Sequence, residues 1–454
     1  MEDKRIITLR DEKVNKAINK MATPAIVGML VMAIYNFVDT IFVSWTNPIA
    51  TSATQVVLPV MLIASSIGLS FGVGSASYIS RLLGQGKKER AEKVVMSALL
   101  AGAILGILAT IFNYFFMEDI FRFFGANAEI MQLTMDYGKY ILLGYTFMIM
   151  SMILNNTLRS EGSAKYSMIG MVIGAILNII LDPIFIFTFK LGISGAAIAT
   201  TVSNAVSFMI LLSMYLRKKT VLRFRLKNVT FNWPIYKEIL KVGLPTFFKQ
   251  LLFSFSMKLL NTAAVEYGDG NDLLATIGIV VRIITIPSYI VFGIGQGFQP
   301  VAGYNYGANQ PKRVLDSFKY TVKITTTVML VTALILNVFG FLILKLFQTT
   351  ETMEAYAILA LRYQSIGLAF LGVTNTVTIF FQSLGKGFKA LLMSISRQGL
   401  FFIPMILIIP GVMGIDGVML SQSFADILAV VLALILVIPC LRERNLKHLS
   451  QAIH

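Results

Sequence analysis

The sequence has few charged residues, almost no histidine and a single cysteine. Charged side chains make up 14% of its 454 residues, against about a quarter in an ordinary soluble domain, so the chain lacks the polar surface that a water-soluble fold of this size needs. Because Cys440 is the only cysteine, an internal disulfide and a multi-thiol metal site are excluded. Both histidines, His448 and His454, stand near the C-terminal end, and we expect neither to act as a base or a metal ligand.

Signatures of catalysis and of ATP hydrolysis are missing as well. With no histidine in the body of the chain, the sequence offers no nucleophile paired with a general base. It also has no Gly-x-x-x-x-Gly-Lys-Ser/Thr phosphate-binding loop, so ATP-driven work on this chain is not expected. We therefore expect a protein that is neither an enzyme nor the carrier of a bound cofactor.

Apolar residues account for 56% of the chain and fall into long runs. A run of about 20 apolar residues is long enough to cross a bilayer as a helix. Lipid hydrocarbon offers no hydrogen-bond partners, so a chain of this kind spans it as α-helices. The pattern predicts an all-α membrane protein with twelve spans, near residues 24–45, 55–80, 94–117, 135–158, 166–189, 193–216, 239–265, 274–303, 318–346, 356–382, 389–411 and 416–440.

The formal net charge is +16, and the basic residues cluster in alternate loops. This distribution is a topology signal rather than a nucleic-acid-binding surface, because Lys and Arg stay on the cytoplasmic side of membrane proteins. It predicts a multi-pass protein of the cell's inner (cytoplasmic) membrane with both termini in the cytoplasm. The basic set includes Lys4, Arg10, Arg81, Lys87, Arg90, Arg159, Arg217, Lys218, Lys219, Lys312, Arg313, Lys386, Arg442, Arg444 and Lys447, and the alternate loops carry Glu118, Asp119, Glu129, Asp269, Asp272, Glu351 and Asp416.

The second half of the chain resembles the first at an offset of about 222 residues. Gly192-Ile193-Ser194-Gly195 aligns with Gly414-Ile415-Asp416-Gly417, and Pro24 with Pro245. A nearly constant offset indicates duplication. We predict a six-helix lobe over residues 1–216, a basic cytoplasmic linker over 217–238 and a second six-helix lobe over 239–454. Because each half has six spans, the repeat is parallel, and transporters of that plan bind substrate in a cavity between the lobes.

Two acids lie deep inside predicted spans, where an ionisable side chain is costly and marks a functional site by default. These are Asp39 in the first span and Asp182 in the fifth. Asn178 precedes Asp182 by one helical turn, and Thr200 reaches a similar depth in the sixth span. A carboxyl group removed from water holds its proton to higher pH, and carboxylate oxygens also suit a hard cation. The four residues predict a site for H⁺ or Na⁺; the structural alternative is an ion pair or a helix-packing hydrogen bond. Pro183 should loosen the helix next to Asp182.

The second half does not repeat this acidic pair. At the repeat offset Asp182 falls near Pro404, and Asp39 near Leu260 or Asn261, so we expect the coupling ion to bind the first lobe alone. The intramembrane charges of the second half are Lys249, Lys258, Arg282, Arg397 and Asp426. The basic ones either contact substrate or pair and snorkel locally.

Four segments carry a resemblance to a known family across essentially the whole chain. They are Tyr35–Phe42, Ile79–Gly84, Asn178–Pro183 and Gln299–Ala308. Together they resemble the multidrug and toxic compound extrusion (MATE) family, particularly its DinF-like and MepA-like bacterial branches. The resemblance implies twelve helices in two pseudo-symmetric bundles around a V-shaped central cavity. It also implies efflux of cationic, amphipathic small molecules by an antiporter driven by H⁺ or Na⁺.

The resemblance also implies roles for individual residues. Asp39, Asn178, Asp182 and Thr200 would form the cation or proton network. The resemblance also extends to Asn155 and Tyr137, which would contact substrate or support the network. Apart from the resemblance, Gln296, Gln299, Arg282 and Arg397 are further candidates for these two roles. Some members of the family have Glu at the position of Asn155, so a carboxylate there is missing. The partners expected are small organic cations and membrane lipid, with a monomer as the working unit. A lipid-linked oligosaccharide flippase of the same superfamily stays as the alternative, because Lys249, Lys258, Arg282 and Arg397 could line a cationic cavity.

Overall fold

The computed structural model describes residues 3–46, 48–268, 271–345 and 351–441. Within these ranges the chain forms twelve long helical segments. Those of the first half are α2 (Val14–Thr46), α3 (Pro48–Gly84), α4 (Lys88–Phe115), α6 (Met131–Ser160), α7 (Ala164–Pro183) and α8 (Gly192–Leu216). Those of the second half are α9 (Trp233–Tyr267), α10 (Asn271–Gly307), α11 (Pro311–Leu344), α12 (Glu351–Ser383), the broken helix α13 (Gly387–Ile395) with α14 (Phe402–Met413), and α15 (Ile415–Val437).

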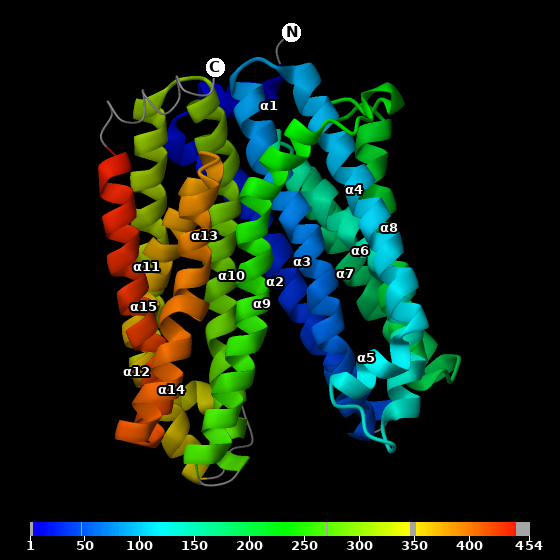
Figure 1. The fold of residues 1–454 in the computed structure, drawn as a ribbon, viewed down its shortest axis with the longest axis vertical. Coiled ribbons are helices and arrows are strands. Elements are labelled where there is room, and N and C mark those ends of the chain that lie inside the picture. The colour runs from blue at the N-terminus through cyan, green and yellow to red at the C-terminus, as the bar shows by residue number, and fades with distance from the viewer. Residues whose placement is uncertain (1–2, 47, 269–270, 346–350, 442–454) are drawn as a thin grey trace.

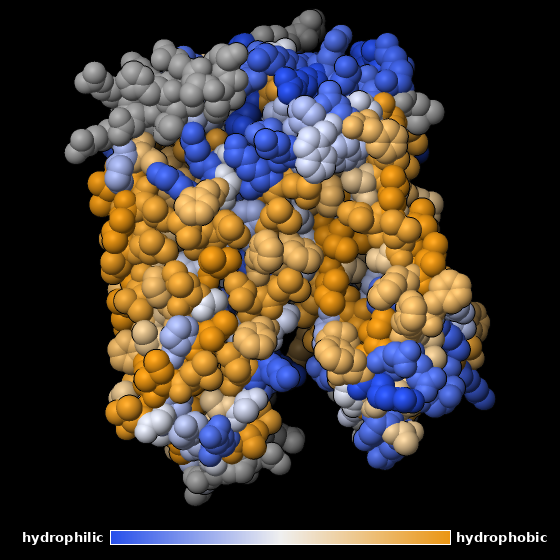
Figure 2. All heavy atoms as spheres, in the orientation of Figure 1, coloured by the Kyte–Doolittle hydropathy of each residue, from blue (hydrophilic) through white to orange (hydrophobic). Residues whose placement is uncertain are grey.

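The predicted spans correspond one by one to these segments, and the all-helical prediction is confirmed. Eleven of them are long and apolar enough to cross a membrane. The twelfth, α9, carries Lys237, Glu238, Lys241, Lys249 and Lys258, which lower its hydropathy. An apolar band covers the middle of the molecule and hydrophilic side chains cover its two ends, as Figure 2 shows. The chain is therefore a multi-pass membrane protein.

The helices form two bundles that meet at one end of the molecule and separate toward the other (Figure 1). The described chain begins and ends where the bundles meet, and we call this end of the molecule the terminal end. There α3 and α9 touch backbone to backbone. A Cβ on Gly74 would collide with the Ile239 carbonyl, and one on Gly243 with the Ser70 carbonyl. At the opposite end the space-filling view shows a hollow between the bundles (Figure 2).

Short elements at the terminal end attach the N-terminal segment and the loop between the halves. The side chain of Arg5, in α1 (Lys4–Arg10), donates to Ser163 at 3.0 Å. Glu161 is fully buried and accepts the Leu222 amide at 2.8 Å. Glu92 in α4 accepts the Arg223 amide at 3.1 Å. These contacts fix the loop against the first bundle.

Three features differ from the expectations or lie beyond them. Helix α9 begins at Trp233, so residues 233–238 of the predicted linker are helical; the lobe boundaries themselves stay a prediction. Two short helices were not predicted, α1 and α5 (Met117–Phe123), and short 3-10 turns cover Leu226–Asn228 and Ile438–Cys440. The expectations at Asp269, Arg442, Arg444, Lys447, His448 and His454 lie outside the described residues, as do those for the side chains of Asp272 and Glu351.

Candidate ion-coupling site

Three helices of the first half bring the predicted acids to one level of the membrane. Counting 1.5 Å per residue, Asp39 lies about 10 Å from the end of α2, and Asp182 about 9 Å from the end of its helical segment at Thr188. Thr200 lies about 12 Å from the start of α8. All three of these helix ends face away from the terminal end. The side chains therefore meet in the half of the molecule where the two bundles separate.

The four predicted residues form one connected cluster. The Asn178 amide donates to Asp182 Oδ1 and to Thr200 Oγ1, both at 3.3 Å. The carboxyl groups of Asp39 and Asp182 lie close enough to interact electrostatically. Asp182 is completely buried, and Asn178 is 2% exposed. Two neighbouring buried carboxyl groups resist being ionised together, so a proton or a cation is favoured between them.

Three acceptor oxygens of the cluster have no partner. Asp39 Oδ1, Asn178 Oδ1 and Asp182 Oδ2 are buried without a hydrogen bond. An unsatisfied buried oxygen is costly, and here three of them sit in one cluster. A proton or a cation with oxygen ligands would satisfy them. Only two of these groups are carboxylates, and the described residues contain no group of three or more His, Cys, Asp or Glu able to hold a metal ion.

The helix that carries Asp182 changes its winding directly after the acid. Pro183 ends α7, and Ile184–Thr188 continues as a wider π-helix. Proline has no N–H to donate and its ring crowds the preceding turn, while π-turns are frequent at functional sites. The prediction that Pro183 loosens the helix is borne out by this change of winding.

Tyrosine side chains complete the surroundings of the acids. Tyr137, on α6, is 4% exposed and lies close enough to Asp39 and Asp182 for electrostatic interaction. Tyr35 interacts with Asp39 and Asp182, and Tyr289 interacts with Tyr35; neither tyrosine was predicted. Tyr35 precedes Asp39 by one helical turn, a spacing that could have identified it. Tyr289 comes from α10 in the second half, and no local pattern in the sequence links it to Asp39.

Asn155 lies elsewhere. It is near the terminal end of α6, about 27 Å along that helix from Tyr137. Its side chain is buried in a satisfied network, where Arg159 donates to its carbonyl oxygen and its amide donates to the Ser167 carbonyl at 3.3 Å. The structure therefore does not bring Asn155 to the acids.

The charged residues of the second half are arranged differently. Arg397 lies in the π-helix Ser396–Phe401 between α13 and α14, and its Nε donates to Asp426 Oδ1 at 2.5 Å. Gln422 donates to the same oxygen at 3.1 Å. Lys249 lies over the Phe292 ring, 4.8 Å from its centre. Asp426 thus has a fixed cationic partner, which the sequence did not reveal.

The remaining predicted residues stand on α10 and do not contact the acids. Arg282 is exposed. The Gln296 amide approaches the Met29 sulfur at 3.7 Å, while its Oε1 has no partner. Gln299 is 7% exposed, and its Nε2 is likewise unpartnered. The two glutamines thus each have a buried polar atom without a partner, and their contact with substrate stays a prediction.

Comparison with known families gives a match over most of the chain. A family model described as MatE matches residues 24–184 and 245–408. The two matched segments correspond to the two halves that the sequence repeat suggests, because the gap between them contains α8 and the predicted linker.

Relatives and solved structures agree with that match over nearly full length. The chain is 31% identical over 454 residues to the multidrug export protein MepA of Staphylococcus aureus (strain N315), covering all of both chains. It is 30% identical over 445 residues to MepA of Staphylococcus saprophyticus, covering 98% of each. A crystal structure of MATE in complex with MaL6 superposes with a TM-score of 0.93 at 28% identity, over 98% of this chain and 100% of the other. A transporter of the MOP superfamily from Pyrococcus furiosus gives 0.92 at 29%, over 98% and 99%.

Proposed function

The chain belongs to the MATE family of membrane transporters, and we propose that it is a multidrug efflux antiporter. It exports cationic, amphipathic small molecules in exchange for H⁺ or Na⁺. The single observation that carries this proposal is the cluster of Asp39, Asn178 and Asp182, whose three buried oxygens lack partners. Such oxygens favour an incoming cation. A transporter, unlike an enzyme, needs no further chemistry than this binding and its release.

The charge distribution supports an orientation for this exchange. Because Lys and Arg gather in the loops at the terminal end, that end faces the cytoplasm and the protein lies in the inner membrane. The hollow between the bundles, visible in Figure 2, then opens to the outside. In this state the acids receive the coupling ion from outside. Rocking of the bundles would carry it inward.

The driving force is adequate for drug export. One pH unit corresponds to about 1.4 kcal/mol per proton, which is roughly a tenfold concentration ratio. If one proton enters for one monovalent cation that leaves, the exchange moves no net charge, and each pH unit sustains about tenfold accumulation outside. All four residues of the cluster come from one chain, so a monomer is sufficient for this cycle.

The alternative of a lipid-linked oligosaccharide flippase needs free positive charge in the cavity. Arg397 is already paired with Asp426 at 2.5 Å, which reduces the charge available for a pyrophosphate. The acids on the first-half side favour cations instead. We therefore retain cation export as the proposed function.

The test is ethidium efflux from vesicles that contain the purified protein, under an imposed pH gradient or an imposed Na⁺ gradient. We expect Asp39→Asn and Asp182→Asn to lose gradient-driven efflux, since neither amide can release a proton or hold a cation by charge. Whichever gradient drives the unmodified protein identifies the coupling ion. Asp119→Asn, which changes an exposed acid of α5 near the same end, is the matched control and should transport normally.

Folding must be verified for each variant by size-exclusion chromatography and thermal unfolding. Full gradient-driven activity in both folded acid variants would rule out the site. Loss of activity in Asp119→Asn as well would show that the effect is not specific to the cluster. Failure of both gradients in the unmodified protein, with transport of a lipid-linked sugar, would favour the flippase.

A further inference from the structure

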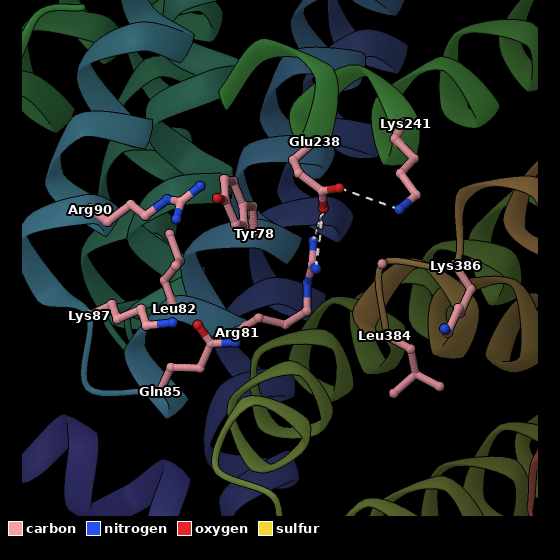
Figure 3. Close-up of a pocket in the computed structure, with 11 residues that line it drawn as sticks. Tyr78, Arg81, Leu82, Gln85, Lys87, Arg90, Glu238, Lys241, Leu384 and Lys386 are labelled. Carbon is pink, nitrogen blue, oxygen red and sulfur yellow. Dashed lines mark hydrogen bonds and ion pairs between the residues drawn. The ribbon is translucent and has the colours of Figure 1, made fainter. Parts of the chain in front are cut away.

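A second polar cavity lies at the terminal end, far from the acids and between the two bundles. It has a volume of about 310 Å³. Tyr78 and Arg81 of α3 line it on one side together with Lys87 and Arg90, while Lys241 of α9 and Lys386 of the α12–α13 turn line the other (Figure 3). We call it the seam pocket, because both halves of the chain contribute to it.

The seam pocket carries excess positive charge. Five cationic side chains line it, and Glu238 is the one carboxylate among its lining residues. Glu238 pairs with Arg81 and with Lys241, each at 3.3 Å. The ion pairs found between described residues include none for Lys87, Arg90 or Lys386. Three cations therefore face the pocket without a fixed counter-charge.

The positive charge of the pocket acts on the pKa of Lys386. Burial lowers the pKa of Lys386, and repulsion by Lys241 lowers it further. A bound anion would relieve both, because it would supply the charge that water supplies elsewhere. The charge of the lining residues therefore favours an anion in the pocket.

The guanidinium groups are held in place before any ligand arrives. Arg81 and Arg90 lie against the Tyr78 ring, 5.3 and 5.7 Å from its centre. Arg81 is almost fully buried and also packs on Gly385, where a Cβ would collide with its guanidinium. A planar guanidinium can hold two oxygens of a phosphate at once, and fixed groups lose little entropy on binding.

We propose that the seam pocket binds a phosphate-bearing anion and that this anion contacts both bundles. The volume accommodates a phosphate group with a small substituent such as glycerol. The anion comes either from a soluble phosphate ester or from the headgroup of an anionic phospholipid, since basic pockets between membrane helices take such headgroups. Because the pocket exists only where the bundles meet, its ligand would stabilise that closed arrangement.

Binding to the purified full-length protein tests the proposal. Inorganic phosphate and glycerol 3-phosphate are titrated by calorimetry, with chloride at equal ionic strength as the reference anion. Phosphatidylglycerol is compared with phosphatidylcholine in nanodiscs by native mass spectrometry. We expect saturable binding of at least one phosphate-bearing ligand and none of chloride. Binding of the soluble ligands alone identifies a soluble ester, and preference for phosphatidylglycerol alone identifies the lipid.

Variants locate the site and test whether it bridges the bundles. Arg90→Gln from the first half and Lys386→Gln from the second should each weaken binding about tenfold. Lys219→Gln, which removes an exposed lysine outside the pocket, should leave binding unchanged. Undiminished binding in both pocket variants, or no phosphate binding by any form, would overturn the proposal. A loss confined to one of the two would overturn the bridging contact.

Discussion

Each half of the chain buries an acid in the membrane, but only the acid of the second half has a cationic partner. Asp426, in the second half, accepts from Arg397 at 2.5 Å and from Gln422 at 3.1 Å. Asp182, in the first half, has a neighbouring carboxyl group and an amide at 3.3 Å, and one of its oxygens has no partner. Both acids are almost fully buried, so the two sites do not differ in burial. They differ in whether a cationic side chain is bound to the acid.

This difference distinguishes an acid that stabilises the fold from an acid that can bind a transported ion. A carboxylate held by a guanidinium has a permanent counter-charge and no reason to bind another cation. A carboxylate without one is costly to bury and is relieved by a mobile cation. The duplicated architecture thus carries an ion site in one half and a structural ion pair in the other. Each prediction below tests one side of this contrast.

The largest effect is expected on transport. Asp182→Asn should reduce gradient-driven ethidium efflux to the leak of protein-free vesicles, because the amide neither binds a proton nor carries charge. Gln422→Leu, which alters the surroundings of Asp426 but keeps its ion pair, should leave the efflux rate within about twofold. Efflux from vesicles containing equal amounts of each variant measures this. Equal losses in the two variants would remove the distinction between the halves.

Changing Asp426 should lower the stability of the protein more than changing Asp182, which is the reverse of the order expected for transport. Asp426→Ala leaves Arg397 without its partner, and breaking a buried pair costs about 3–5 kcal/mol; a lower value near 3 applies here, because the Arg397 side chain is 25% exposed. The double change Arg397→Met with Asp426→Leu should recover most of that loss. Asp182→Asn should cost less than about 1 kcal/mol, since no ion pair is broken. Thermal unfolding in detergent compares the three. An Asp182→Asn loss as large as that of Asp426→Ala would contradict the comparison.

The cluster of Asp39 and Asp182 could be predicted from the sequence, whereas the ion pair of Arg397 with Asp426 could not. Hydrophobic runs determine where spans lie, and helix length places Asp39 and Asp182 at one depth, so their meeting could be predicted. The pairing of Arg397 with Asp426 could not be predicted, because it depends on how the π-helix Ser396–Phe401 and α15 rotate about their axes. Asn155 shows the same limit, since family likeness suggested a site role for a residue that lies at the other end of α6. The seam pocket also needs residues from both halves, which only packing brings together.

Glu161 offers a buried carboxyl group of a third kind, outside the membrane spans. Ser163 and the Leu222 amide donate to it at 2.7 and 2.8 Å, and Arg5 lies 3.9 Å away. Burial raises the pKa of Glu161 from its ordinary 4.5 to about 7, despite these donors. The folded state therefore binds a proton that the unfolded state has released. Stability should fall by up to about 3 kcal/mol as pH rises from 4.5 to 7, and then level off.

Thermal unfolding of the purified protein between pH 5 and pH 8 measures this slope. Glu161→Gln is neutral throughout and should show a smaller slope over the same range, while Asp182→Asn should leave the Glu161 contribution intact. An unchanged slope in Glu161→Gln would mean that the hydrogen-bond donors and Arg5 together keep Glu161 ionised over this pH range, and that the slope has another source.

The smallest expected effect concerns the hydroxyl group at the edge of the first-half cluster. Thr200→Val removes the acceptor of the 3.3 Å bond from Asn178 and keeps the shape of the side chain. A neutral hydrogen bond contributes about 0.5–1.5 kcal/mol, so the ion concentration for half-maximal efflux should shift roughly two- to tenfold while maximal efflux persists. Thr201→Val is the matched control, because Thr201 donates at 2.7 Å to the Tyr140 carbonyl and does not touch the acids. It should lower stability by a similar free energy without shifting the ion dependence. Equal shifts in the two variants would mean that α8 acts through its packing, and Thr200 would then have no place in the ion site.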